Sequence, residues 1–305
     1  MPPEEAWKEW RYMLAVTYFG GTRTDEMDSD DYPLYRTTIE YDKPVQNKST
    51  WPPPSQEMTL SEIIEFMPPV WQQILGHCEY PLDEGEQIAS VLHQGNTVKA
   101  WSDGTEDAGV GAHAHMLQPQ CRGSDNAFKG DNGTLGHPDS IASNWTESFG
   151  AASILLVALA IEFKYDVQEG GYLLLHIDNM EVVNQIKFGM DRAMNSDKHL
   201  KTDYDIWKES VHIMSMLKTA VCAKWVKGHH DLLKKQGNVG PMPMEAHYNI
   251  EMDARAGLRG RQCTTTPPML IPMTTDLASL MLNGCYMITA DIVQHITSDS
   301  TKPGL

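Results

Sequence analysis

The spacing of apolar residues is most regular in the middle of the chain, where it predicts strands and helices. Residues 98–103 and 109–117 alternate as two strands do, with a turn at Gly104, and a third strand is expected within the Gly- and Asp-rich stretch 121–139. Apolar residues recur at intervals of three and four from Phe149 to Phe163, which predicts one face of a buried helix. Residues 172–177 are almost all apolar, as in a central strand covered on both faces.

Further elements are predicted towards residue 262. Short helices are expected over 182–186 and 206–217, a strand over 221–226, and a final helix that starts near Asn249. Three strands followed by helices and strands in alternation combine a meander with crossover connections. The fold class expected from this order is α/β, with a mixed sheet of five strands flanked by helices.

The two ends of the chain are less regular. Residues 1–96 predict an acidic extension, partly irregular, with a helix that begins at Thr59 or Ser61 and a second short helix over 70–75. In residues 263–305, an Asn-Gly pair at 283–284 lies between two apolar runs and predicts a hairpin, after which a last helix could begin near Thr289. We therefore expect three parts, 1–96, 97–262 and 263–305.

Charge limits the ways in which this chain could meet a polyanion. The 305 residues contain 24 Lys and Arg against 41 Asp and Glu, a formal net charge of −17, and residues 1–98 hold 6 of the basic and 17 of the acidic side chains. This excludes a protein that holds nucleic acid by a general basic field. A phosphate partner has to be met locally, for example where acidic side chains gather around metal ions.

The cysteines and apolar segments bear on the compartment. Five cysteines are scattered along the chain without the spacing of a disulfide framework or a zinc site, and they predict reduced thiols. The start of the sequence lacks the features of a secretory signal, and the apolar run 151–161 is too short to span a bilayer. We expect an intracellular protein without a membrane partner, and the sequence does not distinguish cytoplasm from nucleus.

Four acidic residues stand at the ends of predicted elements: Asp103, Glu147, Asp178 and Asp253. Asp103 and Asp178 terminate strands, and Glu147 and Asp253 are expected in the first turns of helices. Ends of neighbouring strands in an α/β sheet meet at one crevice. Carboxylates that converge there would repel one another, and a hard divalent cation such as Mg²⁺ or Mn²⁺ relieves that repulsion.

Each acid also has a simpler interpretation when it is taken alone. Asp178 with Asn179 could form a strand-end turn and a helix cap. Glu147 and Asp253 could complement helix dipoles, and Asp103 could belong to a hairpin turn. The joint occurrence of all four acids, in an order of elements that would assemble them, favours the metal site.

Five segments together resemble the successive motifs of type 1 ribonuclease H, of the kind found in retroelement- and reverse-transcriptase-derived proteins. The segments are WSDGT at 101–105, TES at 146–148, HIDN at 176–179, WVKGH at 225–229 and NIEMD at 249–253. The resemblance covers about residues 97–262 and implies a ribonuclease H-like fold. It also implies hydrolysis of the RNA strand of RNA/DNA hybrids with two Mg²⁺ ions, for which Mn²⁺ could substitute.

The resemblance assigns roles residue by residue. It makes Asp103, Glu147, Asp178 and Asp253 the catalytic metal ligands and His229 a catalytic histidine that shuttles a proton or eases product release. Contacts to the hybrid are expected from Gly104, where the backbone could approach closely, and from a set of polar side chains. That set comprises Thr105, Ser148, Asn179 and Asn249. A polymerase or another retroelement component is a further expected partner.

Several histidines compete for the catalytic role. His230 follows His229 directly, and we favour His229 because it holds the motif position after Lys227 and Gly228. The stretch 232–248 is a long insertion, so the histidine loop is expected to be large. His113 and His115 stand two apart on a predicted strand without a third ligand nearby in the sequence, and we interpret them as surface or hairpin residues.

Other functions fit less well. A degenerate ribonuclease H-like module that binds nucleic acid or a protein without cutting remains the main alternative, since the acidic N-terminal part and the lack of a polymerase domain favour it. Proofreading exonucleases place two carboxylates at positions i and i+2 of the first strand, but residue 105 is Thr. Integrases place their glutamate after the second aspartate, whereas Glu147 precedes Asp178.

Overall fold

The computed structural model describes residues 51–53, 55–119, 126–136, 141–168, 170–193, 203–228, 243–264, 281–282 and 286–287. Residues 1–50 of the expected acidic extension and the helix expected after Thr289 lie outside these ranges. So do His229, His230 and most of the long insertion that follows them.

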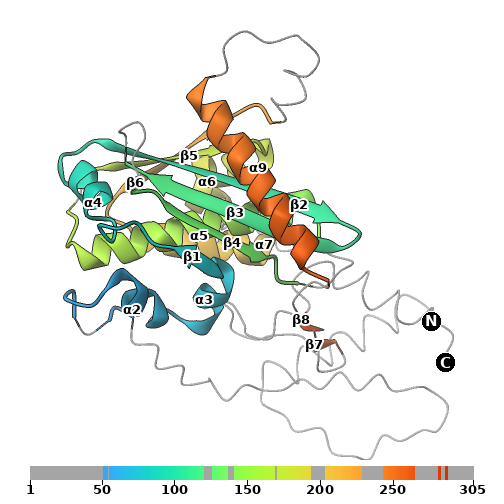
Figure 1. Ribbon diagram of the computed structural model, residues 1–305, viewed down its shortest axis with the longest axis horizontal. Coiled ribbons are helices and arrows are strands. Elements are labelled where there is room, and N and C mark those ends of the chain that lie inside the picture. The colour runs from blue at the N-terminus through green and yellow to red at the C-terminus, as the bar shows by residue number, and fades with distance from the viewer. Residues whose placement is uncertain are drawn as a thin grey trace, which may run out of the picture.

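A six-stranded sheet forms the centre of the molecule (Figure 1), in the order β1-β4-β3-β2-β5-β6. Its strands are β1 (His77–Glu79), β2 (Thr97–Asp107), β3 (Val110–Gln118), β4 (Phe128–Gly133), β5 (Tyr172–Ile177) and β6 (Ala220–Trp225). Strands β2, β3 and β4 form an antiparallel meander, while β5 runs parallel to both β2 and β6. The expected mixed α/β sheet is confirmed, and β1 adds a sixth strand to the five expected.

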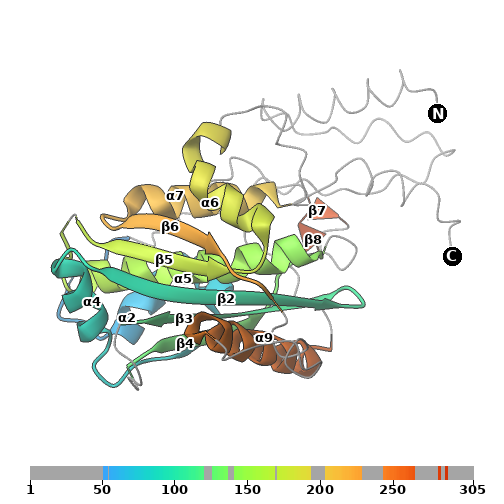
Figure 2. The same ribbon diagram turned by 90° about the horizontal axis from the view of Figure 1, so that it is seen from above.

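Helices cover both faces of this sheet. Helix α5 (Ser143–Lys164) packs against β2 and β3 on one face, with α6 (Met180–Ala193) and α7 (Tyr204–Met216) on the same side. Helix α9 (Met244–Gln262) crosses β2, β3 and β4 on the other face, as Figure 2 shows. Helix α5 is long and apolar enough to cross a membrane, but 94% of its most apolar window is buried, so here it is the core helix.

Residues 60–92 belong to the same core as the sheet. Helices α2 (Leu60–Glu65), α3 (Pro69–Leu75) and α4 (Glu86–His93) bury apolar side chains against α5 and the sheet, and β1 pairs with β4. The boundary expected at residue 96 is therefore not a boundary of the core. The sequence predicted α2 and α3 but not α4, and it could not show what covers these helices. Helix α2 begins after Thr59, not Ser61, with a reciprocal capping box to Glu62.

Gly104 does not form a turn, contrary to expectation. Strand β2 continues through it to Asp107, and the chain reverses at Ala108 and Gly109, both with positive φ. A Cβ atom at position 104 would lie 2.4 Å from the Thr146 hydroxyl oxygen and 2.6 Å from the Glu147 backbone nitrogen. The glycine is needed because α5 lies directly against this point of the strand.

His113 and His115 lie in the antiparallel β2–β3 hairpin, as one of their two interpretations expected, but both are fully buried, so the interpretation as surface residues was wrong. Both faces of β3 are covered, one by α9 and the other by α5 with α3. The His113 ring lies within hydrogen-bond distance of the Ile74 carbonyl oxygen (3.0 Å) and the Thr134 hydroxyl (3.3 Å). Burial lowers the pKa of His113 to about 4 and that of His115 well below its ordinary value.

Near the C-terminus, β7 (Met281–Leu282) and β8 (Tyr286–Met287) pair antiparallel. They fall on the two apolar runs expected to form a hairpin. The Asn-Gly pair between them lies outside the described residues.

Candidate metal centre

The register of two parallel strands brings Asp103 and Asp178 together. Trp101 of β2 is paired with His176 of β5. Asp103 follows Trp101 by two residues, and Asp178 follows His176 by two residues. The two aspartates therefore stand at the same level at the end of the paired stretch, on neighbouring strands. Helix α5 brings Glu147 to this point because Gly104 lets its backbone approach β2 closely.

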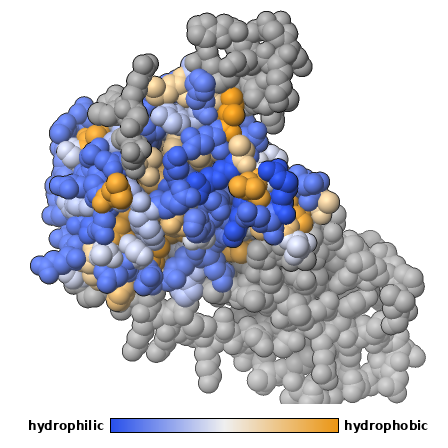
Figure 3. Space-filling view, in the orientation of Figure 1, coloured by the Kyte–Doolittle hydropathy of each residue, from blue (hydrophilic) through white to orange (hydrophobic). Residues whose placement is uncertain are grey.

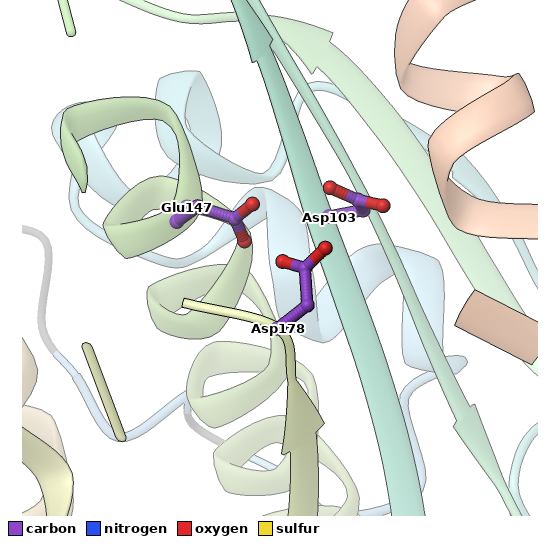
Figure 4. A group of neighbouring side chains, drawn as sticks. All are labelled: Asp103, Glu147 and Asp178. Carbon is purple, nitrogen blue, oxygen red and sulfur yellow. The ribbon is translucent and has the colours of Figure 1, made fainter. Parts of the chain in front are cut away.

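The three acids point toward one another from three separate elements (Figure 4). Asp103, Glu147 and Asp178 each offer one oxygen atom, and these oxygens all lie within 4.8 Å of one another. The residues Asp103 and Glu147 are 5% and 3% exposed, whereas Asp178 is partly exposed. The cluster thus reaches solvent on the side of Asp178.

Burial and mutual repulsion disfavour the ionised forms of this cluster. Burial, followed by the charge of Asp178, raises the pKa of Asp103 to about 8. Burial, followed by the charges of Asp103 and Asp178, raises the pKa of Glu147 well above its ordinary value. A divalent cation among these oxygens would reverse both effects, because it stabilises the ionised carboxylates.

Among the described residues, one hydrogen bond fixes part of the cluster, and one carboxylate oxygen has no partner. The Gly104 backbone N–H donates to Asp103 Oδ1 over 2.8 Å. Glu147 Oε2 is buried without a hydrogen-bond partner among the described residues, so it is a free acceptor in the middle of the site.

Asp253 lies beside this group but not within it. Its charge contributes to the raised pKa of Asp103, although it is not one of the three residues whose oxygens lie within 4.8 Å. Helix α9 starts at Met244, not near Asn249, so Asp253 is in the middle of the helix and not in its first turn. Glu147 also lies beyond the first turn of α5, which contains no acidic residue. Neither acid is placed to complement a helix dipole.

Residues at and after the end of β6 lie against Asp178. The Trp225 indole N–H donates to the Asp178 carbonyl oxygen over 2.8 Å, and Trp225 is 44% exposed. A Cβ atom at Gly228 would lie 2.3 Å from Asp178 Oδ2, so a larger residue there would require the carboxylate to move. The sequence motif contained both residues, but it did not indicate that they contact Asp178.

The residues expected to contact a hybrid are placed differently from one another. Gly104 faces α5, so the space that its missing side chain leaves is occupied by the protein itself. Thr105 is partly exposed one residue further along β2, and Ser148 is buried near Gln185. Asn249 is buried, and its side-chain oxygen has no hydrogen-bond partner among the described residues.

Asn179 takes part in a polar link that the sequence did not reveal. Its side-chain oxygen accepts from the backbone N–H of Glu181 and caps α6, while its amide donates to the Asn144 side chain over 2.6 Å. Asn144 in turn donates to the Glu181 carboxylate over 2.7 Å. This link joins the beginnings of α5 and α6 beside the carboxylates. The expected helix cap at 178–179 is therefore present, next to the acidic cluster and not in place of it.

The donor set suits a hard divalent cation. Oxygen atoms from carboxylates, with a free acceptor and access from solvent, are ligands that Mg²⁺ and Mn²⁺ prefer, and no sulfur or imidazole from the described part of the chain belongs to the cluster. Asp103, Glu147 and Asp178 could hold such an ion, and Asp253 is close enough to act on it electrostatically.

No protein-family model matches the sequence, and no curated protein does. Solved structures that are similar over 54–55% of this chain, at low TM-scores, include the following three. The N-terminal RNase H domain of a Mycobacterium tuberculosis protein, solved as a fusion, is 12% identical, with 94% of its own length covered and a TM-score of 0.38. RNase H1 from Halobacterium salinarum is 15% identical, with 99% of its length covered and a TM-score of 0.37. LC11-RNase H1 in complex with an RNA/DNA hybrid is 9% identical, with 97% of its length covered and a TM-score of 0.37.

The sheet combines a three-stranded antiparallel meander with crossover connections, as expected, and helices cover both of its faces. The structure adds that the two parallel strands lie beside the first strand of the meander. The expected ribonuclease H-like fold is confirmed.

Proposed function

We propose, taking the ribonuclease H-like fold as the premise, that this protein is a metal-dependent endonuclease that hydrolyses the RNA strand of RNA/DNA hybrids. One observation carries the proposal: three acids from β2, α5 and the end of β5 converge within 4.8 Å. Burial and mutual repulsion raise the pKa values of two of them, so the cluster opposes folding unless a cation is bound. A purely structural role does not explain why these acids are gathered.

The residues present fit the two divalent ions of the proposed mechanism. Asp103, Glu147 and Asp178 would hold them, with Asp253 completing the set from α9. When bound, the ions neutralise charge on the scissile phosphate and lower the pKa of water. The same positive charge would let a chain of net charge −17 accept a polyanion at one place.

The chain itself positions these groups. The Gly104 N–H holds Asp103, Trp225 holds the backbone of Asp178 at the exit of β5, and Gly228 leaves room for its carboxylate. His229 follows Gly228 directly in the sequence, which supports its proposed role as the group that moves a proton near the leaving side. Thr105, partly exposed beyond Asp103 on β2, is the proposed contact to the hybrid backbone at this edge.

A non-cutting module that binds nucleic acid or a protein is the second candidate, and the charge of −17 favours its protein-binding form, because affinity for a polyanion would be low without ions. We also propose, on the motif resemblance, that the chain derives from a retroelement and acts inside the cell, where a polymerase could be its partner.

Cleavage of a labelled RNA/DNA hybrid in Mg²⁺ tests the proposal. Wild type should cut the RNA strand, with Mn²⁺ as a substitute and a chelator as inhibitor, while Asp103→Asn and Asp178→Asn should not cut. Asp107→Asn is the matched control, because Asp107 is an exposed acid on the same strand outside the cluster. Activity that survives in both cluster variants would contradict the catalytic assignment. Hybrid binding by wild type without cleavage would favour the second candidate.

A further inference from the structure

Helix α9 is tied to the far edge of the sheet by one arginine. Arg255 donates through both terminal nitrogens to the Glu79 carboxylate, over 2.6 and 3.2 Å, and through Nε to Asp131 Oδ2 over 2.7 Å. Glu79 belongs to β1 and Asp131 to β4. Strand β1 lies outside the region that carries the motif resemblance, so this contact links an added strand to the helix of Asp253.

The contact is shielded enough to be more than a surface ion pair. The side chains of Arg255 and Asp131 are 18% and 14% exposed, and that of Glu79 is 52% exposed. The fork of a guanidinium on a carboxylate also fixes direction, which a single lysine contact does not. The hydrogen bonds from Arg255 lower the pKa of Glu79, in agreement with a persistent ionised pair.

Other contacts attach α9 to the inner strands of the sheet. Its buried residues Met252 and Ala256 pack with Trp101, Ala114 and Met116, and Tyr248 packs against Trp101. These contacts reach β2 and β3, whereas the hydrogen bonds of Arg255 reach β4 and β1. Two further ion pairs join α9 to β4. Lys129 of β4 pairs with Glu251 over 2.5 Å, and Arg259 pairs with Asp131 over 3.8 Å.

Asp253 and Arg255 are two positions apart on α9, so their side chains leave the helix in nearly opposite directions. One side of the helix faces Asp103, whose pKa the charge of Asp253 raises, and the other is held by β1 and β4. A small rotation of the helix would move Asp253 relative to the other three acids. Figure 3 shows the face of the molecule that α9 crosses, where hydrophilic side chains predominate and apolar ones are scattered.

We propose that Glu79, Arg255 and Asp131 form a brace that positions Asp253 at the carboxylate cluster, so that strand β1 is a working part of the metal centre. Glu79 and Arg255 are positioning residues in this view and do not touch the reacting atoms. The inference rests on the proposed function for its purpose, but the brace itself is a property of the metal-free protein.

Hydrogen exchange in the metal-free full-length protein tests whether the brace holds α9. Amides of residues 249–259 should exchange about tenfold faster in Arg255→Gln and less so in Glu79→Gln, with Arg255→Lys in between because it keeps the charge and loses the fork. The control is Glu84→Gln, which breaks the ion pair of Glu84 with Lys164 (2.9 Å) away from α9. Unchanged exchange in both Arg255→Gln and Glu79→Gln would overturn the brace.

Calorimetric titration with Mn²⁺ alone tests whether the brace serves the site. Arg255→Gln should weaken Mn²⁺ binding about tenfold, as loss of an outer-sphere partner does, and Glu79→Gln about threefold. Asp253→Asn removes the positioned acid itself, and the brace variants should approach its loss of Mn²⁺ affinity. Glu84→Gln should bind Mn²⁺ as wild type does. Wild-type Mn²⁺ affinity in both brace variants would overturn the link to the metal centre. Absence of Mn²⁺ binding by wild type would instead contradict the proposed function, and exchange would still decide the brace.

Discussion

Two groups of buried titratable side chains lie on neighbouring strands of the same sheet, and they differ in what burial does to them. Burial and mutual repulsion raise the pKa values of Asp103 and Glu147. Burial is the main cause that lowers the pKa values of the two histidines of β3. A histidine becomes neutral by losing a proton at ordinary pH, so it can be buried at little expense, whereas gathered carboxylates at neutral pH need a proton or a cation.

Unpartnered polar atoms do not separate the two groups. His115 stacks between His113 and Phe128, and neither of its ring nitrogens has a hydrogen-bond partner among the described residues. Glu147 also has an unpartnered oxygen. The carboxylates differ from the histidines because three elements place like charges at one point. Convergence of like charge, more than burial, therefore indicates a ligand site.

The largest expected effect separates activity from stability. Glu147→Gln should reduce hybrid cleavage by about three orders of magnitude, since several kcal/mol of metal-dependent stabilisation of the transition state are lost. The same change should raise the free energy of unfolding of the metal-free protein by about 1 to 2 kcal/mol at pH 8, because a buried carboxyl no longer has to stay protonated there. Cleavage kinetics and urea unfolding in chelator measure the two effects.

His113→Gln is the matched variant on the other group. It should lower the free energy of unfolding and leave cleavage within about twofold of wild type. A loss of cleavage comparable to that of Glu147→Gln, with the fold intact, would contradict the separation of the two groups.

The pH dependence of stability should have opposite signs in the two groups. The pKa of His113 falls from 6.5 to about 4 on folding, so its contribution is present above pH 6.5 and is lost as pH falls towards 4. The full loss is about 3 kcal/mol. The pKa of Asp103 rises from 3.8 to about 8, so its contribution is present below pH 3.8 and is lost as pH rises towards 8.

Urea unfolding in chelator from pH 4 to pH 8 measures both slopes. His113→Gln should flatten the acidic arm of the profile and Asp103→Asn the arm towards pH 8. Equal flattening of the same arm by both variants would show that the two groups do not titrate independently.

A smaller effect tests how the carboxylate region is packed. Gly104→Ala should destabilise the protein by about 1 to 3 kcal/mol, because the new Cβ would press on Thr146 and on the backbone of α5. The control is Gly257→Ala on α9, where a Cβ would find only the end of the Arg261 side chain, at 3.5 Å. That control should stabilise the helix by about 0.5 to 1 kcal/mol. Thermal unfolding of both variants measures these changes in stability. Equal midpoints of unfolding for Gly104→Ala and Gly257→Ala would contradict the expectation.

The smallest effect concerns the support of the histidines. The Ser153 hydroxyl donates to the Phe149 carbonyl over 2.9 Å and lies 3.4 Å from the His113 ring. Ser153→Ala should reduce the free energy of unfolding by about 0.5 to 1 kcal/mol and leave cleavage unchanged. A measurable loss of cleavage would link the buried histidines to the metal centre after all.

Sequence patterns alone predicted the order of the main elements and singled out the acids, although only Asp178 stands at the end of its element. Periodicity located β5 and α5 because a central strand and a core helix carry long apolar patterns. Strand ends and motif spacing singled out Asp103 and Asp178, and neighbouring parallel strands then had to bring them to one edge.

Which segment covers each face, and which distant charges meet, depended on the three-dimensional packing. Gly104 was expected in a turn and packs against α5, and the β3 histidines, expected as surface or hairpin residues, are hairpin residues that are fully buried. Residues 60–92 join the main core, and Arg255 connects α9 to a strand more than 170 residues earlier. The local sequence pattern of a segment indicates whether the segment prefers burial or a turn. The segments that it packs against are set by contacts between residues far apart in the sequence, which a short window of sequence does not contain.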